Sequence, residues 1–173
     1  MGVSGNAIVY GDNISTDLIY PGRYTYILLT KEQMAEHALE DLDPGFKDKD
    51  AHGCILVAGI NFGCGSAREQ AVKCLKEKGI RAIIAKSISR IYYRNCINEG
   101  LLPITCPEAV DEIRDGDKIE IDVDNGLVMV RNQKFCFPQY PAYVRNILDC
   151  GGLIASVRQE LKQQNGGKDN ASD

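Results

Sequence analysis

The fold is decided by residues 54–105, which read CILVAGINFGCGSAREQAVKCLKEKGIRAIIAKSISRIYYRNCINEGLLPIT. Short apolar runs bounded by turn residues predict buried strands, and longer runs with apolar positions three and four apart predict helices. The predicted strands are 54–62, 80–85 and 101–105, and the predicted helices are 67–78 and 88–99. Strands that alternate with helices must run parallel, so this stretch predicts an α/β core whose strands are buried on both faces.

The flanking segments extend this core. A capping-box pattern, Thr30 followed by Gln33, opens one helix, and the turn Asp124-Asn125-Gly126 joins two strands as a β-hairpin. The remaining elements are predicted as strands at 6–10, 118–123 and 127–130, helices at 31–41, 141–148 and 153–162, and a polar loop at 43–53. We predict one domain over residues 1–164 and a disordered polar tail over 165–173.

Composition excludes several classes of protein. The 173 residues carry a formal charge of -4, which disfavours nucleic-acid binding because that binding depends on neutralising phosphates. No apolar run approaches the roughly 18 residues that a membrane span needs, and the N-terminus has no export signal, so we expect a cytoplasmic protein. Seven cysteines occur without a CxxC pair, which predicts reduced thiols and no metal bound by this chain itself.

The chemistry concentrates in the turn between the first predicted strand and helix of the core, residues 61–69, NFGCGSARE. Gly63 and Gly65 allow a sharp turn and a close approach of a ligand to the backbone. The helix that follows offers free N–H groups, and Arg68 adds a planar fork of donors. These features predict an anion site, with phosphate and carboxylate equally acceptable on physical grounds.

Familiar motifs do not fit this turn. A dinucleotide-binding GxGxxG motif fails because Arg68 holds the third glycine position, and neither a P-loop nor a GxSxG nucleophile elbow is present. His37 and His52 are the only histidines, and we expect structural or surface roles for both. Ser66 with Glu69 three residues later also fits a helix-capping box, which is a purely structural alternative to catalysis.

Several motifs together resemble one family. The turn and its continuation, residues 61–71, resemble the swivel-domain signature of the aconitase superfamily, although Ala67 stands where aconitase has a second serine. The match continues through residues 12–22, 81–91 and 95–104, and it spans about residues 6–150. The length resembles the stand-alone small subunits of two-subunit hydro-lyases. The resemblance implies an aconitase-type swivelling β/β/α domain with a parallel sheet core and a C-terminal β-hairpin.

The resemblance also implies a reaction and its residues. Hydroxy-acid isomers are interconverted by dehydration and rehydration, with a [4Fe–4S] cluster held by a large aconitase-like subunit in a heterodimer or heterotetramer. This chain would bind no cofactor. Ser66 would abstract a proton next to a carboxylate, and Arg68 with Gly65 would bind the dicarboxylic substrate. Asp17 would support histidine chemistry in the partner, with Thr16 beside it. A serine base must be held as an alkoxide by nearby amides and cations.

The loop after Pro21-Gly22 is where such small subunits differ in substrate. Homoaconitase-type relatives carry an arginine two residues after the tyrosine that matches Tyr24, and here that position is Tyr26. Tyr26 and Ile27 therefore favour an alkyl-substituted malate, because a buried carboxylate needs a partner. The alternative is that these side chains pack into the core and Arg23 serves a distal carboxylate.

Isopropylmalate, an intermediate of leucine biosynthesis, is the common alkyl-malate, while 2,3-dimethylmalate, a methylmalate/citraconate pair and homoaconitate stay open. A non-catalytic anion-binding regulatory module and a purely structural subunit are the alternatives of another class. We also expect loops 20–30 and 61–68 to share one face, toward the partner, and to be mobile in the isolated subunit.

Overall fold

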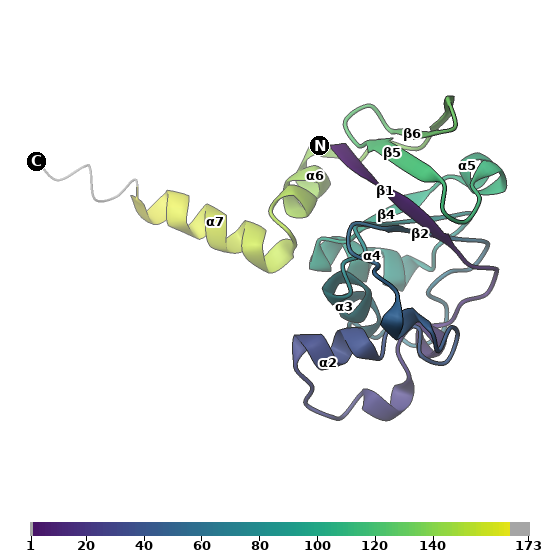
Figure 1. Cartoon of the computed structure of the whole chain (residues 1–173). Coiled ribbons are helices and arrows are strands. Elements are labelled where there is room, and N and C mark those ends of the chain that lie inside the picture. Colours follow the sequence, from purple (N-terminus) through teal and green to yellow (C-terminus); the bar gives the residue numbers. More distant parts are fainter. Residues whose placement is uncertain (1, 167–173) are drawn as a thin grey trace, which may run out of the picture.

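A computed structural model describes residues 2–166, which form one seven-stranded sheet with helices packed around it (Figure 1). The strands lie in the order β4-β3-β2-β1-β5-β6-β7. They comprise β1 (Gly2–Val9), β2 (Ile55–Ala58), β3 (Ala82–Ala85), β4 (Leu102–Thr105), β5 (Lys118–Asp122), β6 (Leu127–Val130) and β7 (Gln133–Cys136). Strands β1 to β4 pair in parallel, whereas β5, β6 and β7 form an antiparallel extension on β1.

The helices are α1 (Thr16–Ile19), α2 (Lys31–Glu36), α3 (Gln70–Glu77), α4 (Arg90–Glu99), α5 (Pro107–Glu112), α6 (Ala142–Asp149) and α7 (Leu153–Gly166). Helices α1 to α5 follow the parallel strands along the chain, and α6 and α7 form its C-terminal part. Two short 3-10 helices occupy Gly22–Tyr24 and Phe46–Asp48. The predicted α/β class with a parallel core and a C-terminal hairpin is confirmed.

Two predicted helix boundaries are wrong, two elements were not predicted, and the predicted strand 54–62 is shorter, since β2 covers only Ile55–Ala58. Helix α2 ends at Glu36 rather than at residue 41, because buried Leu39 adopts a left-handed backbone with φ 56°. Strand β7 adds a third strand to the hairpin, and α5, six residues with proline in its first turn, was not predicted. Helix α3 begins at Gln70 rather than at Ala67, which changes the candidate site described below.

Strand β1 joins the two halves of the sheet. Its first residues pair with β5 and its last three, from Ala7 onward, pair with β2. Gly5 lies at this change of partner, and a Cβ there would lie 2.0 Å from the carbonyl oxygen of Gly53. A side chain therefore cannot fit at Gly5 without moving backbone, so glycine is required for the crossing.

Both faces of β2 and β3 are buried along their whole length, as their continuous apolar runs predict. On β2, Ile55 and Val57 face a core shared with β5, β6, α5 and α6. Leu56 and Ala58 face the opposite core, which is shared with α1, α3 and α4. The strands are thereby fixed in register, because a slip of one residue would exchange the two cores.

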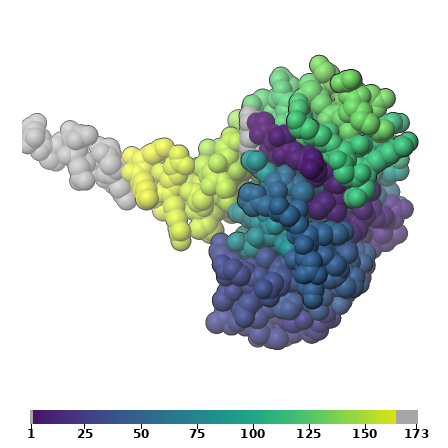
Figure 2. Space-filling model, in the orientation of Figure 1, coloured from purple at the N-terminus to yellow at the C-terminus, as the bar shows by residue number. Residues whose placement is uncertain are grey.

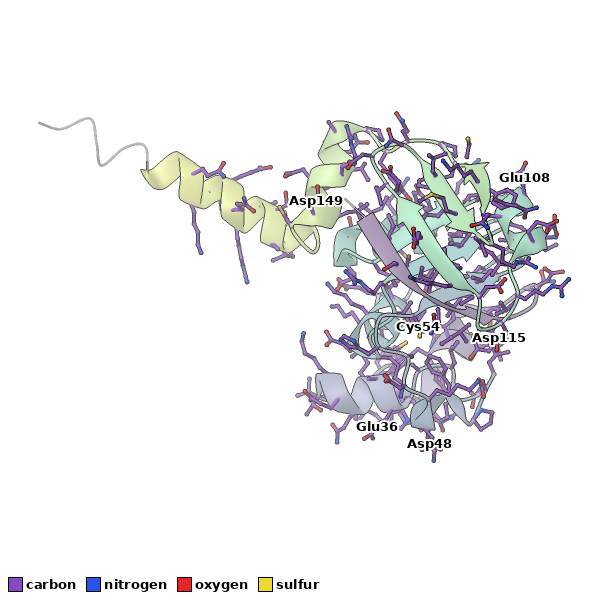
Figure 3. The ribbon with its side chains drawn as sticks, turned by 45° about the horizontal axis from the view of Figure 1, so that its top comes forward. Glu36, Asp48, Cys54, Glu108, Asp115 and Asp149 are labelled. Atoms are coloured by element: carbon purple, nitrogen blue, oxygen red, sulfur yellow. The ribbon has the colours of Figure 1, made fainter. Side chains whose placement is uncertain are left out.

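The C-terminal helix leaves the body of the molecule. Figures 1 and 2 show α7 projecting away from the sheet, and Figure 3 labels Asp149 at the end of α6, just before the chain turns into it. Helix α7 continues to Gly166, so the predicted tail is wrong for residues 165 and 166, and its remainder, 167–173, lies outside the described residues. In the described part of the chain, no helix is long and apolar enough to span a membrane.

All seven cysteines are free thiols, as predicted, and three of them are buried.

Between α3 and α4, two carboxylates share one lysine: Lys73 Nζ lies 2.8 Å from Glu69 and 3.7 Å from Glu99. Burial, together with the hydrogen bond to Glu69, raises the pKa of Glu99 to about 7. The same hydrogen bond lowers the pKa of Glu69, so the pair shares one proton near neutral pH.

We predict that the contribution of Glu99 to stability is lost as pH rises from about 4.5 to about 7, because folded Glu99 binds its proton more tightly than unfolded glutamate does. The substitution Glu99→Gln removes this loss. Its melting temperature should exceed that of the wild type at pH 8 and match it near pH 5. The control Glu160→Gln, on the exposed surface of α7, should have the same small effect at both pH values. If the melting temperature of the wild type rises relative to that of Glu99→Gln as pH increases, the raised pKa of Glu99 is contradicted.

Candidate active site at the Gly63–Arg68 turn

The site lies where two loops meet beyond the carboxyl ends of β1 and β2. Gly63 N–H donates to Ile14 C=O at 2.8 Å, and Thr16 N–H donates to Cys64 C=O at 2.8 Å. The loop after β1 therefore runs parallel to the turn after β2. Adjacent parallel strands end at the same edge of a sheet, which is where α/β proteins place their ligands.

Glycines make this close approach possible. Gly63 has φ +70°, and a Cβ there would lie 2.2 Å from the ring of Tyr92. A Cβ on Gly59 would lie 1.7 Å from Asp12 Oδ1, which instead accepts a hydrogen bond from Ile60 N–H at 2.8 Å. These positions need glycine for space, and Gly63 needs it for backbone conformation as well.

Ser66 is exposed in the turn and does not cap the helix. Glu69 occupies the N-cap position of α3 without a side-chain capping bond, so the predicted Ser66–Glu69 capping box is wrong. The reason is local: Arg68 N–H donates to Ser66 C=O at 2.9 Å, which closes a separate turn before the helix begins. Within residues 2–166 the Ser66 hydroxyl has no hydrogen-bond partner, and the amides of Gly65 and Ala67 have no acceptor.

Arg68 is the most enclosed charge at the site, with only 12% of its side chain exposed. Its Nη2 donates to Asp17 Oδ1, and its Nη1 donates to Thr25 Oγ1 at 3.2 Å. Asp17 lies in the first turn of α1 and is itself mostly exposed. The ion pair thus joins the exposed carboxylate of Asp17 to the Arg68 guanidinium, which is largely shielded from solvent.

Two buried polar atoms at this place have no partner among the described residues: Arg68 Nε and Thr16 Oγ1. Thr16 is only 1% exposed, and a Cβ on Gly65, which has φ +96°, would lie 3.4 Å from its hydroxyl oxygen. A buried polar group without a hydrogen bond costs roughly 1–3 kcal/mol. An unused guanidinium N–H and an unused hydroxyl suit the oxygens of a bound carboxylate.

Arg23 and Tyr24 are held on the outer side of the 20–30 loop. The guanidinium of Arg23 pairs with both carboxylate oxygens of Asp41 at 2.9 Å and with Glu40 at 2.8 Å. The ring of Tyr24 stacks on His37 with 3.8 Å between centroids. The stacking gives His37 a structural role, as expected. The guanidinium of Arg23 is occupied by ion pairs within this chain.

The tip of this loop projects from the surface. Tyr26 is 98% exposed, Leu28 is fully exposed and Ile27 is half exposed, so the alternative that they pack into the core is wrong. The hydrogen bond between Thr25 and Arg68 places loops 20–30 and 61–68 side by side, as predicted. That this face meets the partner, and that the loops are mobile in the isolated subunit, stay predictions. Exposed apolar side chains beside a site are typical of a surface that another molecule covers.

A pocket of about 380 Å³ lies beside Ser66 and is completed by Arg90, Ile91 and Asn95 of α4. None of these three residues, nor Thr25, was predicted as a site residue. The signal that could have found Arg90 is its place after β3, a strand that ends at the same edge as β2. In the part of the chain that the structure describes, no group of three or more His, Cys, Asp or Glu residues gathers as metal ligands.

Comparisons with known proteins agree with this geometry. The family of the aconitase C-terminal domain matches residues 11–109. The 3-isopropylmalate dehydratase small subunit of Caldanaerobacter subterraneus is 48% identical over 92% of this chain and all of that protein. That of Caldicellulosiruptor bescii is 47% identical over 92% of this chain and 96% of that protein. The crystal structure of 3-isopropylmalate dehydratase (leuD) from Methanocaldococcus jannaschii is 40% identical, with a TM-score of 0.89 over 96% of this chain and 99% of that one.

We predict that Gly63→Ala destabilises the isolated chain by more than about 2 kcal/mol, because the methyl group meets both a left-handed backbone and the Tyr92 ring. Gly116→Ala is the matched control: its φ is +81°, but nothing lies within 4 Å of the added Cβ. It should cost only about 1 kcal/mol. Denaturant unfolding measures both, and equal losses would show that Tyr92 does not close the turn.

Proposed function

Because the chain belongs to the 3-isopropylmalate dehydratase small subunits of the aconitase family, we propose that it forms one half of a hydro-lyase active site that interconverts 2-isopropylmalate and 3-isopropylmalate in leucine biosynthesis. The observation that carries the proposal is the buried Arg68 with its unused Nε, next to the unused Thr16 hydroxyl and the exposed Ser66. The other half belongs to a large aconitase-like subunit.

Arg68 binds a substrate carboxylate. Its guanidinium is shielded from water, so its attraction for an anion is screened less than that of a surface arginine. Asp17 and Thr25 each take one terminal nitrogen, which leaves Nε for the substrate. Thr16 adds a hydroxyl donor to the same carboxylate, and Gly65 places no side chain against that hydroxyl, where a Cβ would lie 3.4 Å away.

Ser66 removes the proton next to that carboxylate. A serine hydroxyl is a base only as an alkoxide, and an alkoxide needs donors around it. The turn supplies them: in the described structure the amides of Gly65 and Ala67 point to no acceptor, and the hydroxyl itself is not consumed by a helix cap. The exposed position of Ser66 lets it reach a substrate that is held mainly by the partner.

The [4Fe–4S] cluster belongs to the partner in this proposal, since no ligand group gathers within residues 2–166. When bound there, the cluster supplies a Lewis acid for the substrate hydroxyl and one carboxylate. Asp17 keeps its role toward a partner histidine: Oδ1 accepts from Arg68, while Oδ2 has no hydrogen-bond partner among the described residues. The exposed loop tip at Tyr26, Ile27 and Leu28 covers the substrate when the subunits meet.

The loop tip also supports the choice of substrate. Its exposed residues are apolar or phenolic, and the nearest cations in sequence on either side are already paired, Arg23 with Asp41 and Glu40 and Lys31 with Glu77. An alkyl group at this end of the substrate needs no counter-charge, whereas the distal carboxylate of homoaconitate does. 2,3-Dimethylmalate and methylmalate/citraconate share the alkyl chemistry and stay within the proposal as second choices.

We predict that the purified chain is inactive alone and hydrates unsaturated alkyl dicarboxylates when mixed with a cluster-bearing large subunit. In the mixture, Ser66→Ala should lower kcat by about 10²- to 10⁴-fold. Arg68→Lys should mainly raise KM, because lysine has no N–H donor at the place where the Nε of Arg68 lies without a partner.

The control Ser4→Ala, on exposed β1 away from the turn, should leave both constants unchanged. Loss of ultraviolet absorbance of the unsaturated acid gives the rates. Full activity in both site variants would remove Ser66 and Arg68 from the mechanism. A wild-type mixture that binds dicarboxylates without turnover would favour the regulatory anion-binding module.

We predict that Tyr26→Arg shifts the substrate preference of the assembled enzyme. A cation at this exposed loop position offers a partner to a distal carboxylate and disfavours an alkyl group. The ratio of kcat/KM for homoaconitate to that for isopropylmalate should rise by about tenfold or more. Tyr26→Phe, which keeps the ring, should leave the ratio near that of the wild type, and an unchanged ratio in the arginine variant would separate this loop from substrate choice.

A further inference from the structure

We infer that Thr25 is a positioning residue, which together with Asp17 fixes the plane of the Arg68 guanidinium and makes carboxylate binding depend on the folded 20–30 loop. The inference rests on the proposed function in one respect only: the carboxylate is taken to be that of the substrate. Thr25 itself is not a catalytic residue, because it contacts Arg68 rather than the reacting atoms.

The geometry around the guanidinium supports this role. Nη1 donates to Thr25 Oγ1 at 3.2 Å, and Nη2 donates to Asp17 Oδ1, so two nitrogens are held by residues of two different segments. A guanidinium is planar, so fixing two of its nitrogens fixes the direction of the third. That third nitrogen, Nε, is the buried donor without a partner in the described chain.

The loop is built to bring Thr25 to this place. Thr25 N–H donates to Gly22 C=O at 3.1 Å and ends the 3-10 helix Gly22–Tyr24. A Cβ on Gly22 would lie 3.1 Å from Arg68 Nη1 and 3.0 Å from Asp17 Oδ1, so the loop backbone packs directly on the ion pair. Thr25 is half-buried, although Tyr26 beside it is almost fully exposed.

The opposite side of the loop is anchored independently. Arg23 pairs with Asp41 and Glu40, and Tyr24 stacks on His37. The loop is thus fastened to the segment after α2 at one end, and its Thr25 hydroxyl reaches the guanidinium at the other. Loss of that hydroxyl should free one terminal nitrogen of Arg68 while leaving the loop attached.

The consequence for catalysis is specific. Without an acceptor on Nη1, the guanidinium is held from one side only, so the whole plane can turn about the Cδ–Nε bond. The Nε–H then no longer has a fixed direction toward the carboxylate, so substrate binding weakens. Ser66 lies outside this contact, so turnover of bound substrate changes little.

The first test compares Thr25→Val, which has the same shape without the hydroxyl, with Thr25→Ser, which restores it. In the enzyme assembled with the large subunit, Thr25→Val should raise KM about tenfold with kcat within about twofold of the wild type. Thr25→Ser should return KM to nearly the wild-type value. Thr105→Val, an exposed threonine at the end of β4, is the control and should change neither constant.

The second test needs no activity. In the isotope-labelled chain alone, NMR signals of the Arg68 guanidinium should show slow rotation of its terminal nitrogens in the wild type and in Thr25→Ser, and averaged signals in Thr25→Val. Melting temperatures of all three should agree closely, because Thr25 lies in a half-buried loop.

An Arg68 signal in Thr25→Val identical to that of the wild type would overturn the inference, as would an unchanged KM in an active assembly. If the wild-type assembly shows no turnover of isopropylmalate, the proposed function fails, and the NMR comparison still decides the role of Thr25.

Discussion

A buried guanidinium must find acceptors, and the site is organised around that need at Arg68. Asp17 from α1 and Thr25 from the following loop supply two acceptors, and Nε stays without one in the described structure. The unpaired donor has a cost in the isolated chain, and a substrate carboxylate would remove it. The Arg68 side chain therefore links the turn after β2 to α1 and to the 20–30 loop, in addition to the backbone hydrogen bonds at Ile14 and Thr16.

The parallel half of the sheet brings these segments together. Strands β1 and β2 end at the same edge, and the glycines at 59 and 63 let the turn pass against Asp12 and Tyr92 without a side chain in the way. The antiparallel strands β5 to β7 contribute to the opposite core and stay clear of the turn. The candidate site thus lies at the parallel half of the sheet, and the antiparallel half only contributes to the core.

The site is open in this chain, as one half of a larger site would be. Ser66 is exposed, its neighbouring amides are unoccupied in the described chain, and Tyr26 and Leu28 stand out from the surface. In the enzyme we propose, such groups would be covered, since the roles proposed for Ser66 and Arg68 are best served away from water. The chain belongs to the 3-isopropylmalate dehydratase small subunits, and the name of these relatives implies a large subunit as the partner.

The sequence by itself determined the α/β core and the turn at 61–69, because apolar periodicity and glycine spacing are local properties. The family followed from the resemblance of several motifs, above all residues 61–71. Tertiary structure alone decided that Ser66 is not a helix cap, since Arg68 N–H closes a turn before α3 begins. It also decided that Arg23 pairs with Asp41 and that Thr25 reaches Arg68. Those contacts join residues 18 and 43 positions apart, and no local pattern encodes which distant acceptor a long, flexible cation will meet.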